Sequence, residues 1–414
     1  MTARPTMMGP RPTVLRGATL VDGTTVDVTL ADGRIATVAP AVGEPAPDTE
    51  VVDLRGFLLS PAAVEPHAHL DKAFLADVVA NETGDLIGAI RAMQSIRERL
   101  SVEETVIRAE RAARLMAANG FGAVRTHADA TTDHGLTSVE ALVALRRRVA
   151  DVIDVEIVAL SGWPVAGKAG ADQRALLRAA LDTGADLVGG CPHLEDDRDT
   201  RAATEVLLAI AADHGRDVDL HTDETLDPSV LGLVHLAEAV AAGFPHRVTA
   251  SHCVALAMQP EARQREIAEA VADAGISVVA LPMTNLYLQG RDHPQAMPRG
   301  VTAVRALRTS GVNVAAGADN LQDPFNPLGR ACPLETAGLL VATTHLRADD
   351  AWSMVTDAAR VALGQLPLAV EVGAPADLVA IRADSTRQAI AFAPTAPGAR
   401  QVWHRGVRVP RGDG

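Results

Sequence analysis

The chain has 414 residues, of which 48% are hydrophobic and 22% charged, as is typical of a water-soluble globular protein. The formal net charge of −14 is dispersed without a basic stripe, and only 2% of the residues are aromatic, so the composition argues against a nucleic-acid partner. Three widely spaced cysteines and the lack of an apolar stretch as long as a membrane span argue against a disulfide framework and a membrane protein, and we expect a cytoplasmic location.

Residues 1–60 predict short β-strands separated by Gly, Asp and Pro turns, with strands expected at 13–16, 25–30, 34–38 and 50–54. Residues 366–414 have the same texture, and strands are expected there at 376–381, 389–393 and 401–403. Each end is too short to form a core comfortably by itself. We therefore expect the two ends to pair into one small β-sandwich domain.

Residues 61–365 alternate short apolar runs with longer segments of helical spacing. The expected strands are 62–65, 123–126, 156–160, 186–188, 217–220, 247–250, 277–280 and 313–316, and helices are expected at segments such as 174–182, 202–214 and 263–274. Eight strands alternating with helices predict an α/β fold, a (β/α)8 TIM-like barrel. A doubly wound sheet is the alternative, but no GxGxxG motif or P-loop follows an early strand. The polar segment 286–300 predicts a long loop over the barrel mouth.

Histidines and an aspartate follow the predicted barrel strands at their carboxyl ends. His67 and His69 come after the first strand, and residues two apart in a strand project to the same side. His221 follows the fifth strand, His252 the sixth and Asp319 the eighth. Any one of them could be structural, but together they converge on the rim where barrel active sites lie. Nitrogen and oxygen ligands without thiolates favour one zinc or iron ion, with manganese as a further possibility.

Glu224 lies three residues beyond His221, which places a carboxylate over the same rim. It is a candidate proton shuttle between water and a substrate nitrogen. The alternative is an acid at a helix N-terminus that stabilises the helix dipole. Only the neighbouring His221 favours the shuttle.

Several segments resemble the cytosine-deaminase-like branch of the amidohydrolase superfamily. Segment 66–72 (PHAHLDK) is similar to its first-strand signature, and segment 221–224 (HTDE) is similar to its HxDE motif. Further similar segments are 249–252 (TASH), 288–291 (LQGR) and 317–320 (GADN), the last followed by 323–325 and 327–329. The resemblance covers the chain from about Gly17 to Val407.

The resemblance implies a role for each matching residue. One divalent metal ion would be bound by His67, His69, His221 and Asp319. Glu224 would carry a proton to a ring nitrogen, while His252 and Asp319 would orient and deprotonate the attacking water, giving metal-bound hydroxide. The branch lacks a bridging carboxylated lysine, and the fourth-strand segment 187–193 contains no lysine, so one metal is favoured over two.

Departures from the branch concern the substrate. Cytosine deaminases carry a glutamine after the third strand that reads the amide edge of the pyrimidine, but segment 159–164 contains none. The paired aspartates expected after the eighth strand are here Asp319 and Asn320. A pocket built to hydrogen-bond one edge rejects ligands that lack it. The sequence therefore argues against cytosine itself as the natural substrate.

Four residues are candidates for substrate binding: Trp163, Lys72, Gln289 and Asn320. Trp163 could stack on a flat ring or simply pack, and Lys72 could contact a substrate carbonyl or anion or pair with nearby acids. Gln289 is a candidate by resemblance, with a solvated loop glutamine as the alternative. His127, after the second strand, could support the metal site from behind or be a core histidine.

The leading hypothesis is a metal-dependent hydrolytic deaminase that acts on a small nitrogen heterocycle such as a pyrimidine or s-triazine and releases ammonia or an alkylamine. One alternative is a cyclic amide hydrolase that opens the ring, as hydantoinase-like relatives do. The other is a metal-binding barrel without catalysis, against which Glu224 and Asp319 argue. We expect a homo-oligomer with a small-molecule substrate and without a nucleic-acid or membrane partner.

Overall fold

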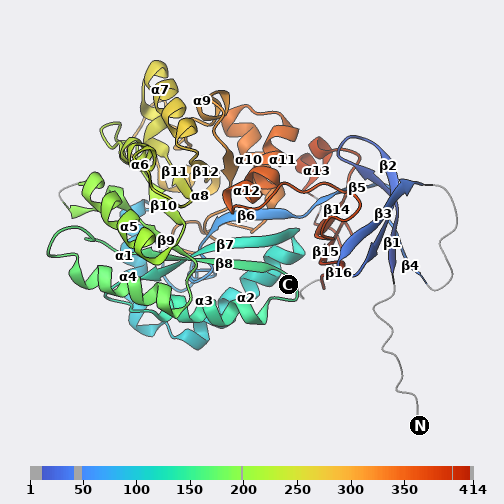
Figure 1. Ribbon diagram of the computed structural model, residues 1–414, viewed down its shortest axis with the longest axis horizontal. Helices are drawn as coiled ribbons and strands as arrows, with labels where there is room; N and C mark the ends of the chain where they lie inside the picture. The colour runs from blue at the N-terminus through green and yellow to red at the C-terminus, as the bar shows by residue number, and fades with distance from the viewer. Residues whose placement is uncertain (1–11, 42–48, 197–198, 394, 411–414) are drawn as a thin grey trace, which may run out of the picture.

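The computed structural model describes residues 12–41, 49–196, 199–393 and 395–410. Two eight-stranded sheets organise the chain. One sheet forms the barrel with its surrounding helices, and the other lies beside it and contains strands from both ends of the chain (Figure 1). The predicted combination of an α/β barrel with a small β-sandwich-like domain is confirmed.

Eight parallel strands pair in chain order around the barrel: β6 (Ala63–Ala68), β7 (Phe121–Ala130), β8 (Asp154–Ser161), β9 (Leu187–Gly190), β10 (Val218–Thr222), β11 (Val248–His252), β12 (Ser277–Ala280) and β13 (Val314–Ala316). Main-chain hydrogen bonds join the first and last strands just beyond their ends. The Asp319 N–H donates to the His67 carbonyl at 3.0 Å, and the His69 N–H donates to the Asp319 carbonyl at 3.1 Å. Each predicted barrel strand overlaps an observed one.

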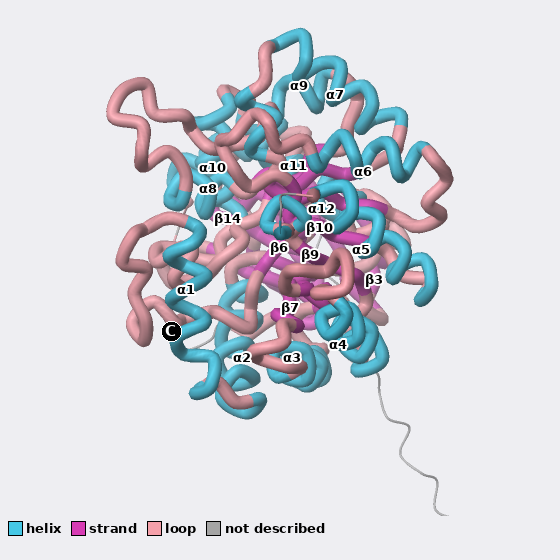
Figure 2. Tube along the Cα trace, turned by 90° about the vertical axis from the view of Figure 1, so that its left-hand side faces the viewer, coloured by secondary structure: helices cyan, strands magenta, loops and turns pink. Residues whose placement is uncertain are grey.

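Helices surround the strands (Figure 2). They are α1 (Leu86–Ile96), α2 (Val102–Ala118), α3 (Thr137–Arg148), α4 (Ala171–Thr183), α5 (Thr200–His214), α6 (Gly232–Ala241), α7 (Glu261–Asp273), α8 (Pro282–Leu288), α9 (Val304–Thr309), α10 (Pro333–Thr344), α11 (Ala348–Val355) and α12 (Asp357–Ala362). Local side chains define several starts, since Ser101 accepts from the Glu104 N–H and Asp199 from the Ala202 N–H. The predicted loop 286–300 begins within α8, and its remainder has neither helix nor strand.

The small sheet joins both ends of the chain. Its strands are β1 (Thr13–Leu20), β2 (Thr25–Ala31), β3 (Arg34–Pro40), β4 (Glu50–Asp53), β5 (Phe57–Pro61), β14 (Leu378–Arg382), β15 (Arg400–His404) and β16 (Val407–Arg408). The antiparallel pair of β5 with β14 connects the N-terminal and C-terminal strands. Leu15, Val28, Leu59 and Trp403 are buried in one core there, so neither end forms that core alone. Residues 1–11 of the predicted domain lie outside the described residues, and the predicted boundaries at 60/61 and 365/366 stay predictions.

The predicted strand 389–393 is wrong. Residues 389–392 belong to helix α13 (Thr386–Phe392), which packs against α10 and α11 of the barrel. Ser385 accepts a hydrogen bond from the Gln388 N–H at 3.3 Å, and Gln388 Oε1 accepts from the Asp384 N–H at 3.0 Å. This is a variant of the capping arrangement that starts helices. The Ser-x-x-Gln spacing signalled the helix, but the short apolar run was interpreted as a strand.

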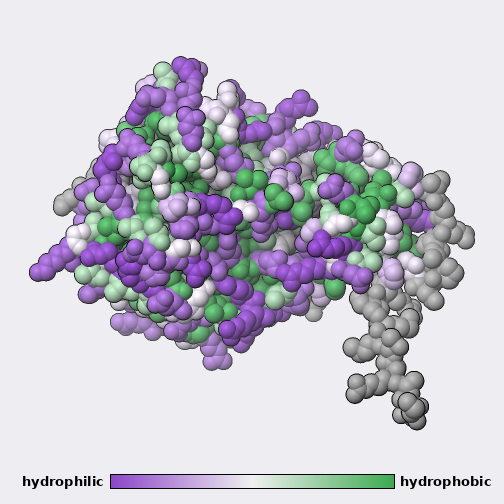
Figure 3. All heavy atoms as spheres, viewed as in Figure 1, coloured by the Kyte–Doolittle hydropathy of each residue, from purple (hydrophilic) through white to green (hydrophobic). Residues whose placement is uncertain are grey.

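The outer surface is dominated by hydrophilic residues on the face shown in Figure 3. None of the helices in the described ranges combines the length and the hydrophobicity needed to span a bilayer. The core of the barrel lies between the strands and the ring of helices and is built mainly from Ala, Val and Leu.

Candidate active site

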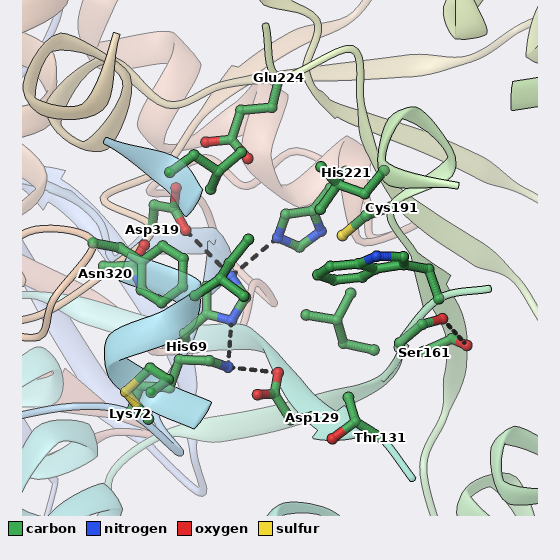
Figure 4. Close-up of a pocket in the computed structure, with 18 of the residues that line it drawn as sticks. His69, Lys72, Asp129, Thr131, Ser161, Cys191, His221, Glu224, Asp319 and Asn320 are labelled. Atoms are coloured by element: carbon green, nitrogen blue, oxygen red, sulfur yellow. Dashed lines mark hydrogen bonds and ion pairs between the residues drawn. The ribbon is translucent and has the colours of Figure 1, made fainter. Parts of the chain in front are cut away.

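The predicted chemistry-bearing side chains meet at one rim of the barrel. His67 lies in β6, His221 in β10 and His252 at the end of β11, while His69 and Asp319 lie just after β6 and β13. All five side chains are buried. Because the carboxyl ends of the barrel strands share one rim, residues far apart in the sequence come together there (Figure 4).

Candidate ligand atoms among these residues form two overlapping groups, His67 with His69 and Asp319, and His67 with His221 and His252, and within each group the atoms lie within 4.8 Å of one another. His69 Nε2 lies 3.1 Å from His221 Nε2 and 3.3 Å from Asp319 Oδ1, and His67 Nε2 lies 3.6 Å from the same oxygen. Ligand atoms bonded to one ion at about 2.1 Å lie within about 4.2 Å of one another. The distances therefore fit His67, His69 and Asp319 around a common centre, with His221 Nε2 beside His69.

The hydrogen bonding of these atoms also fits a cation. Within the described ranges, His67 Nε2 and both carboxylate oxygens of Asp319 are buried without a hydrogen-bond partner. Buried polar atoms rarely lack a partner, and a divalent cation would satisfy them. Burial, reinforced by neighbouring imidazoles, lowers the pKa of His67 and of His221 well below the ordinary value, which favours the neutral, metal-binding form.

The backbone is strained at two of these positions. His252 has a φ of 69° and Asp319 a φ of 65°, in the left-handed region that non-glycine residues rarely adopt. Such strain persists where the surrounding structure enforces it and is concentrated at functional sites. Here it directs both side chains toward the same rim.

A hydrogen-bonded chain supports His67 from behind. Ser251 Oγ lies 2.9 Å from His67 Nδ1 and donates to Asp219 Oδ1 at 2.8 Å, and Arg125 pairs with Asp219 at 3.0 Å. This arrangement leaves His67 Nε2 directed toward the candidate metal centre. His127 lies beneath His67, with ring centroids 4.0 Å apart, and is fully buried outside the cavity.

Replacing Ser251 with Ala should weaken metal binding by about 10- to 100-fold, because residues that orient a ligating histidine typically have effects of this size. The measurement is the metal dissociation constant obtained by competition with a chelator. Ser229→Ala is the control, because its hydroxyl bonds Asp227 in an exposed loop. Native metal affinity in the Ser251→Ala protein would contradict the positioning role.

Glu224 faces His252 across the rim. Its Oε1 lies 3.4 Å from His252 Nδ1 and accepts a hydrogen bond from Asn285 Nδ2 at 3.3 Å. Burial, with a further contribution from the charge of Asp319, raises the pKa of Glu224 well above its ordinary value. Burial lowers the pKa of His252 to about 4. Glu224 can therefore hold a proton close to a neutral imidazole.

The alternative role of Glu224 at a helix N-terminus is wrong. Asp223 occupies that role, because its two carboxylate oxygens accept the N–H groups of Gly232 and Leu233, both at 2.9 Å, where α6 begins. Glu224 makes no such contact and lines a cavity instead. The adjacent acids are thus separated into a helix cap and a residue of the site.

A cavity opens at this rim. His69, His221, His252, Glu224 and Asp319 are part of its wall. Three predicted substrate-binding residues also line it: Lys72, Trp163 and Asn320. Most of the remaining wall is apolar, with contributions from Leu86, Ile90, Met93, Leu160, Leu194 and Phe325. The cavity can therefore hold a flat ring between apolar faces with its polar edges against charged groups.

Gln289 does not line this cavity. It lines a neighbouring groove that shares Glu224 with the cavity, and its Nε2 donates to the main-chain carbonyl of Glu224 at 3.2 Å. The position of Gln289 therefore does not favour a direct contact with a ring in the cavity. Its contact supports the backbone that carries Glu224.

Lys72 lies in a buried ionic cluster at the cavity wall. Its Nζ is 2.7 Å from Asp129 Oδ1 and 3.2 Å from both carboxylate oxygens of Asp71. Although burial opposes its charged form, the charges of Asp129 and Asp71 raise the pKa of Lys72 above its ordinary value. Both sequence-based expectations for Lys72 are therefore compatible with its position, since it pairs with acids and also lines the cavity.

Sequence reasoning missed three residues of the site: Ser251, Asn285 and Asp129. Ser251 immediately precedes His252, and its strand position two residues after Thr249 was an available signal for an inward side chain. Asn285 lies on α8 after the seventh strand, where only Gln289 was predicted to be functional. Asp129 follows His127 by two residues in β7, so the His-x-Asp spacing repeats the alternation that made His67 and His69 noticeable.

Comparisons with known proteins extend these observations. The model of a family described as the amidohydrolase family matches residues 75–410. The pterin deaminase of Rhizobium rhizogenes is 37% identical over 362 residues, which are 85% of this chain and 81% of that protein. The crystal structure of 5-methylcytosine deaminase from Klebsiella pneumoniae has a TM-score of 0.87 at 32% identity and covers 97% of this chain and 98% of that chain. The crystal structure of N-isopropylammelide isopropylaminohydrolase from Burkholderia multivorans has a TM-score of 0.81 at 28% identity, covering 96% and 98%.

Proposed function

The chain belongs to the amidohydrolase family, and from that premise we propose that it is a metal-dependent aminohydrolase of a small nitrogen heterocycle. The relatives named above are hydrolases of carbon–nitrogen bonds. Pterin is the first candidate substrate because the pterin deaminase is 37% identical to this chain, and 5-methylcytosine is the second. The observation that carries the proposal is the buried Glu224 carboxyl group, which lies on the same cavity wall as His69, His221 and Asp319.

The metal site that we propose consists of His67, His69, His221 and Asp319, with one divalent ion, zinc or iron or else manganese. When bound, the ion supplies water activation at neutral pH and stabilises negative charge. Its ligands are neutral imidazoles and one carboxylate, a set that suits these metals. The rest of the chemistry is assigned to side chains of the chain itself.

Proton transfer is assigned to Glu224, His252 and Asp319. His252 and Asp319 would orient a water and accept its proton as the water oxygen bonds to the ring carbon. Glu224 would deliver its proton to the ring nitrogen. The proton taken from the water would then pass to the amino group, so that its bond to carbon breaks and ammonia leaves, and the hydroxyl proton would return to Glu224 as that oxygen becomes a carbonyl. The raised pKa of Glu224 supports this role, because a carboxyl group that holds a proton near neutral pH can donate it. Asn285 holds Glu224 in place.

The substrate ring would lie between the apolar side chains of the cavity, with Trp163 available for stacking and Lys72 and Asn320 at its edges. Gln289 is proposed to position Glu224 rather than to bind the ring.

The proposal predicts that the metal-loaded protein releases ammonia from pterin or 5-methylcytosine and leaves the ring intact. Ammonia is measured by a coupled assay and the product by mass spectrometry, with N-isopropylammelide included to detect isopropylamine. A new carboxylate would instead indicate ring opening by a cyclic amide hydrolase. Binding of metal without turnover of any of these compounds would contradict the proposal. Homo-oligomer formation and a cytoplasmic location stay predictions.

A further inference from the structure

The cavity has a second polar region beside His69, away from Glu224. Asp129, at the end of β7, lies between two cations, since its Oδ1 is 2.7 Å from Lys72 Nζ and its Oδ2 is 3.1 Å from Nη2 of Arg97. Arg97 belongs to the short helix Arg97–Arg99 that follows α1. In Figure 4, Lys72 and Asp129 lie on one side of His69, and Asp319 and Glu224 lie on the other.

This cluster lies at the cavity wall itself. The side chains of Asp129, Lys72 and Arg97 are at least 89% buried, and all three line the cavity. Around them the wall is largely apolar, with Met93 and Leu160 among its residues. Charged groups placed at an otherwise apolar wall are the usual means by which a pocket fixes the orientation of a ligand.

Asp129 retains capacity to accept hydrogen bonds. A carboxylate has about four lone-pair sites, and its contacts with Lys72 and Arg97 use one oxygen each. The main-chain N–H of Asp129 donates to Asp71 Oδ2 at 3.1 Å, which fixes the backbone as well. The acceptor is thus held in place before a ligand arrives, so little ordering cost remains for binding.

Lys72 places a donor next to this acceptor. Besides Asp129 and Asp71, its Nζ has a contact with His69 Nδ1 at 3.4 Å, which is long for a hydrogen bond. An acceptor and a donor 2.7 Å apart are complementary to a ring edge that carries an N–H beside a carbonyl. Pterin and 5-methylcytosine both have such a lactam edge, but in pterin its N–H is bonded to the reacting carbon, whereas in 5-methylcytosine its carbonyl is the nearer of the two groups.

We propose that Asp129 is a substrate-binding residue that determines specificity: it accepts a hydrogen bond from a ring N–H, while Lys72 donates to the adjacent carbonyl. The substrate class is therefore an amino-substituted lactam heterocycle. This inference rests on the proposed function, because it assumes that the reacting carbon lies at the metal end of the cavity. A ring methylated at that nitrogen loses the hydrogen bond and places a methyl group against the Asp129 carboxylate.

The test is a comparison of pterin with 3-methylpterin. Both compounds are titrated by calorimetry into the metal-loaded Glu224→Gln protein, in which we expect turnover to be slowed by at least about 100-fold. Pterin should bind about 10- to 100-fold more tightly than 3-methylpterin, the range expected for a hydrogen bond to a charged group. Adding Asp129→Asn should reduce this ratio to below about 3-fold, because the amide has one acceptor oxygen in place of two and carries no negative charge to attract the ring N–H.

Asp133 provides a matched control. It also pairs with Arg97, but its side chain is 48% exposed and does not line the cavity. Asp133→Asn should therefore leave the affinity ratio unchanged. If the ionic cluster were only structural, Asp129→Asn and Asp133→Asn would change this ratio to the same extent. Asp129→Glu keeps the charge between the cations and moves the carboxylate, and it is the second variant if Asp129→Asn unfolds; it should also lower the ratio.

Equal binding of pterin and 3-methylpterin by the Glu224→Gln protein would overturn the inference, as would a ratio that Asp129→Asn leaves intact. The pair 5-methylcytosine and 1,5-dimethylcytosine repeats the test on a smaller ring, and failure to bind both pterin and 5-methylcytosine also overturns it. A different outcome would contradict the proposed function alone: the native protein binds pterin and 3-methylpterin with the expected affinity ratio but releases no ammonia from pterin.

Discussion

Replacing Glu224 with Gln is expected to lower kcat by about 10²- to 10⁴-fold, the range attributed to a general acid or base, while the metal content stays at the native level. Gln has nearly the same shape, but its amide cannot carry a proton between water and a ring nitrogen. The contacts of Glu224 with Asn285 and His252 do not include the candidate metal ligands His67, His69 and His221. The substitution therefore separates proton transfer from metal binding.

The measurement is kcat for ammonia release, together with metal analysis of the same preparation. Glu238→Gln is the control, because Glu238 is exposed on α6, pairs with Arg201 and does not line the cavity. Its kcat should be that of the native protein. Native kcat in the Glu224→Gln protein would show that another group carries the proton.

Removal of the metal is expected to abolish activity and to lower the thermal midpoint of unfolding. Without an ion, His67 Nε2 and both oxygens of Asp319 are buried without hydrogen-bond partners among the described residues, and the folded state lacks the compensating interaction. An ion that binds only the folded state at about 100 times its dissociation constant stabilises that state by about 2.7 kcal/mol. Chelation followed by reloading with zinc, iron or manganese should show both effects and their reversal.

The corresponding variant is His69→Ala, which removes the imidazole that lies 3.1 Å from His221 and 3.3 Å from Asp319. It should reduce bound metal by at least about 10-fold and kcat by more. His235→Ala is a suitable control, because His235 bonds Thr200 on the outer helices. Full metal content in His69→Ala, or activity that survives chelation, would contradict the metal site.

Local patterns were sufficient to predict most of the fold. Each barrel strand is a short apolar run followed by a segment of helical period, and that alternation depends only on neighbouring residues. The errors also have local causes. Segment 389–393 is apolar enough for a strand, but Ser385 and Gln388 cap a helix there, and β5 (Phe57–Pro61) was not recognised because it directly precedes β6.

The site residues likewise include some that the sequence revealed and others that it did not. The positions of His67, His69, His221 and Asp319 after strands were visible in the sequence, because the carboxyl ends of parallel barrel strands must face one rim. The side chains that bond these residues were not visible. Ser251, Asn285 and Asp129 have common polar types, and nothing in their local sequence states which distant partner each will meet.

The amino-acid sequence by itself determined the barrel, the pairing of the two chain ends and the residues able to bind a metal, because periodicity and strand-end placement are properties of adjacent residues. Only the tertiary structure decided that Asp223 caps a helix while Glu224 faces the cavity, and that Asp129 stands between Lys72 and Arg97. These outcomes depend on burial and on distances between strands that the chain brings together only when it folds.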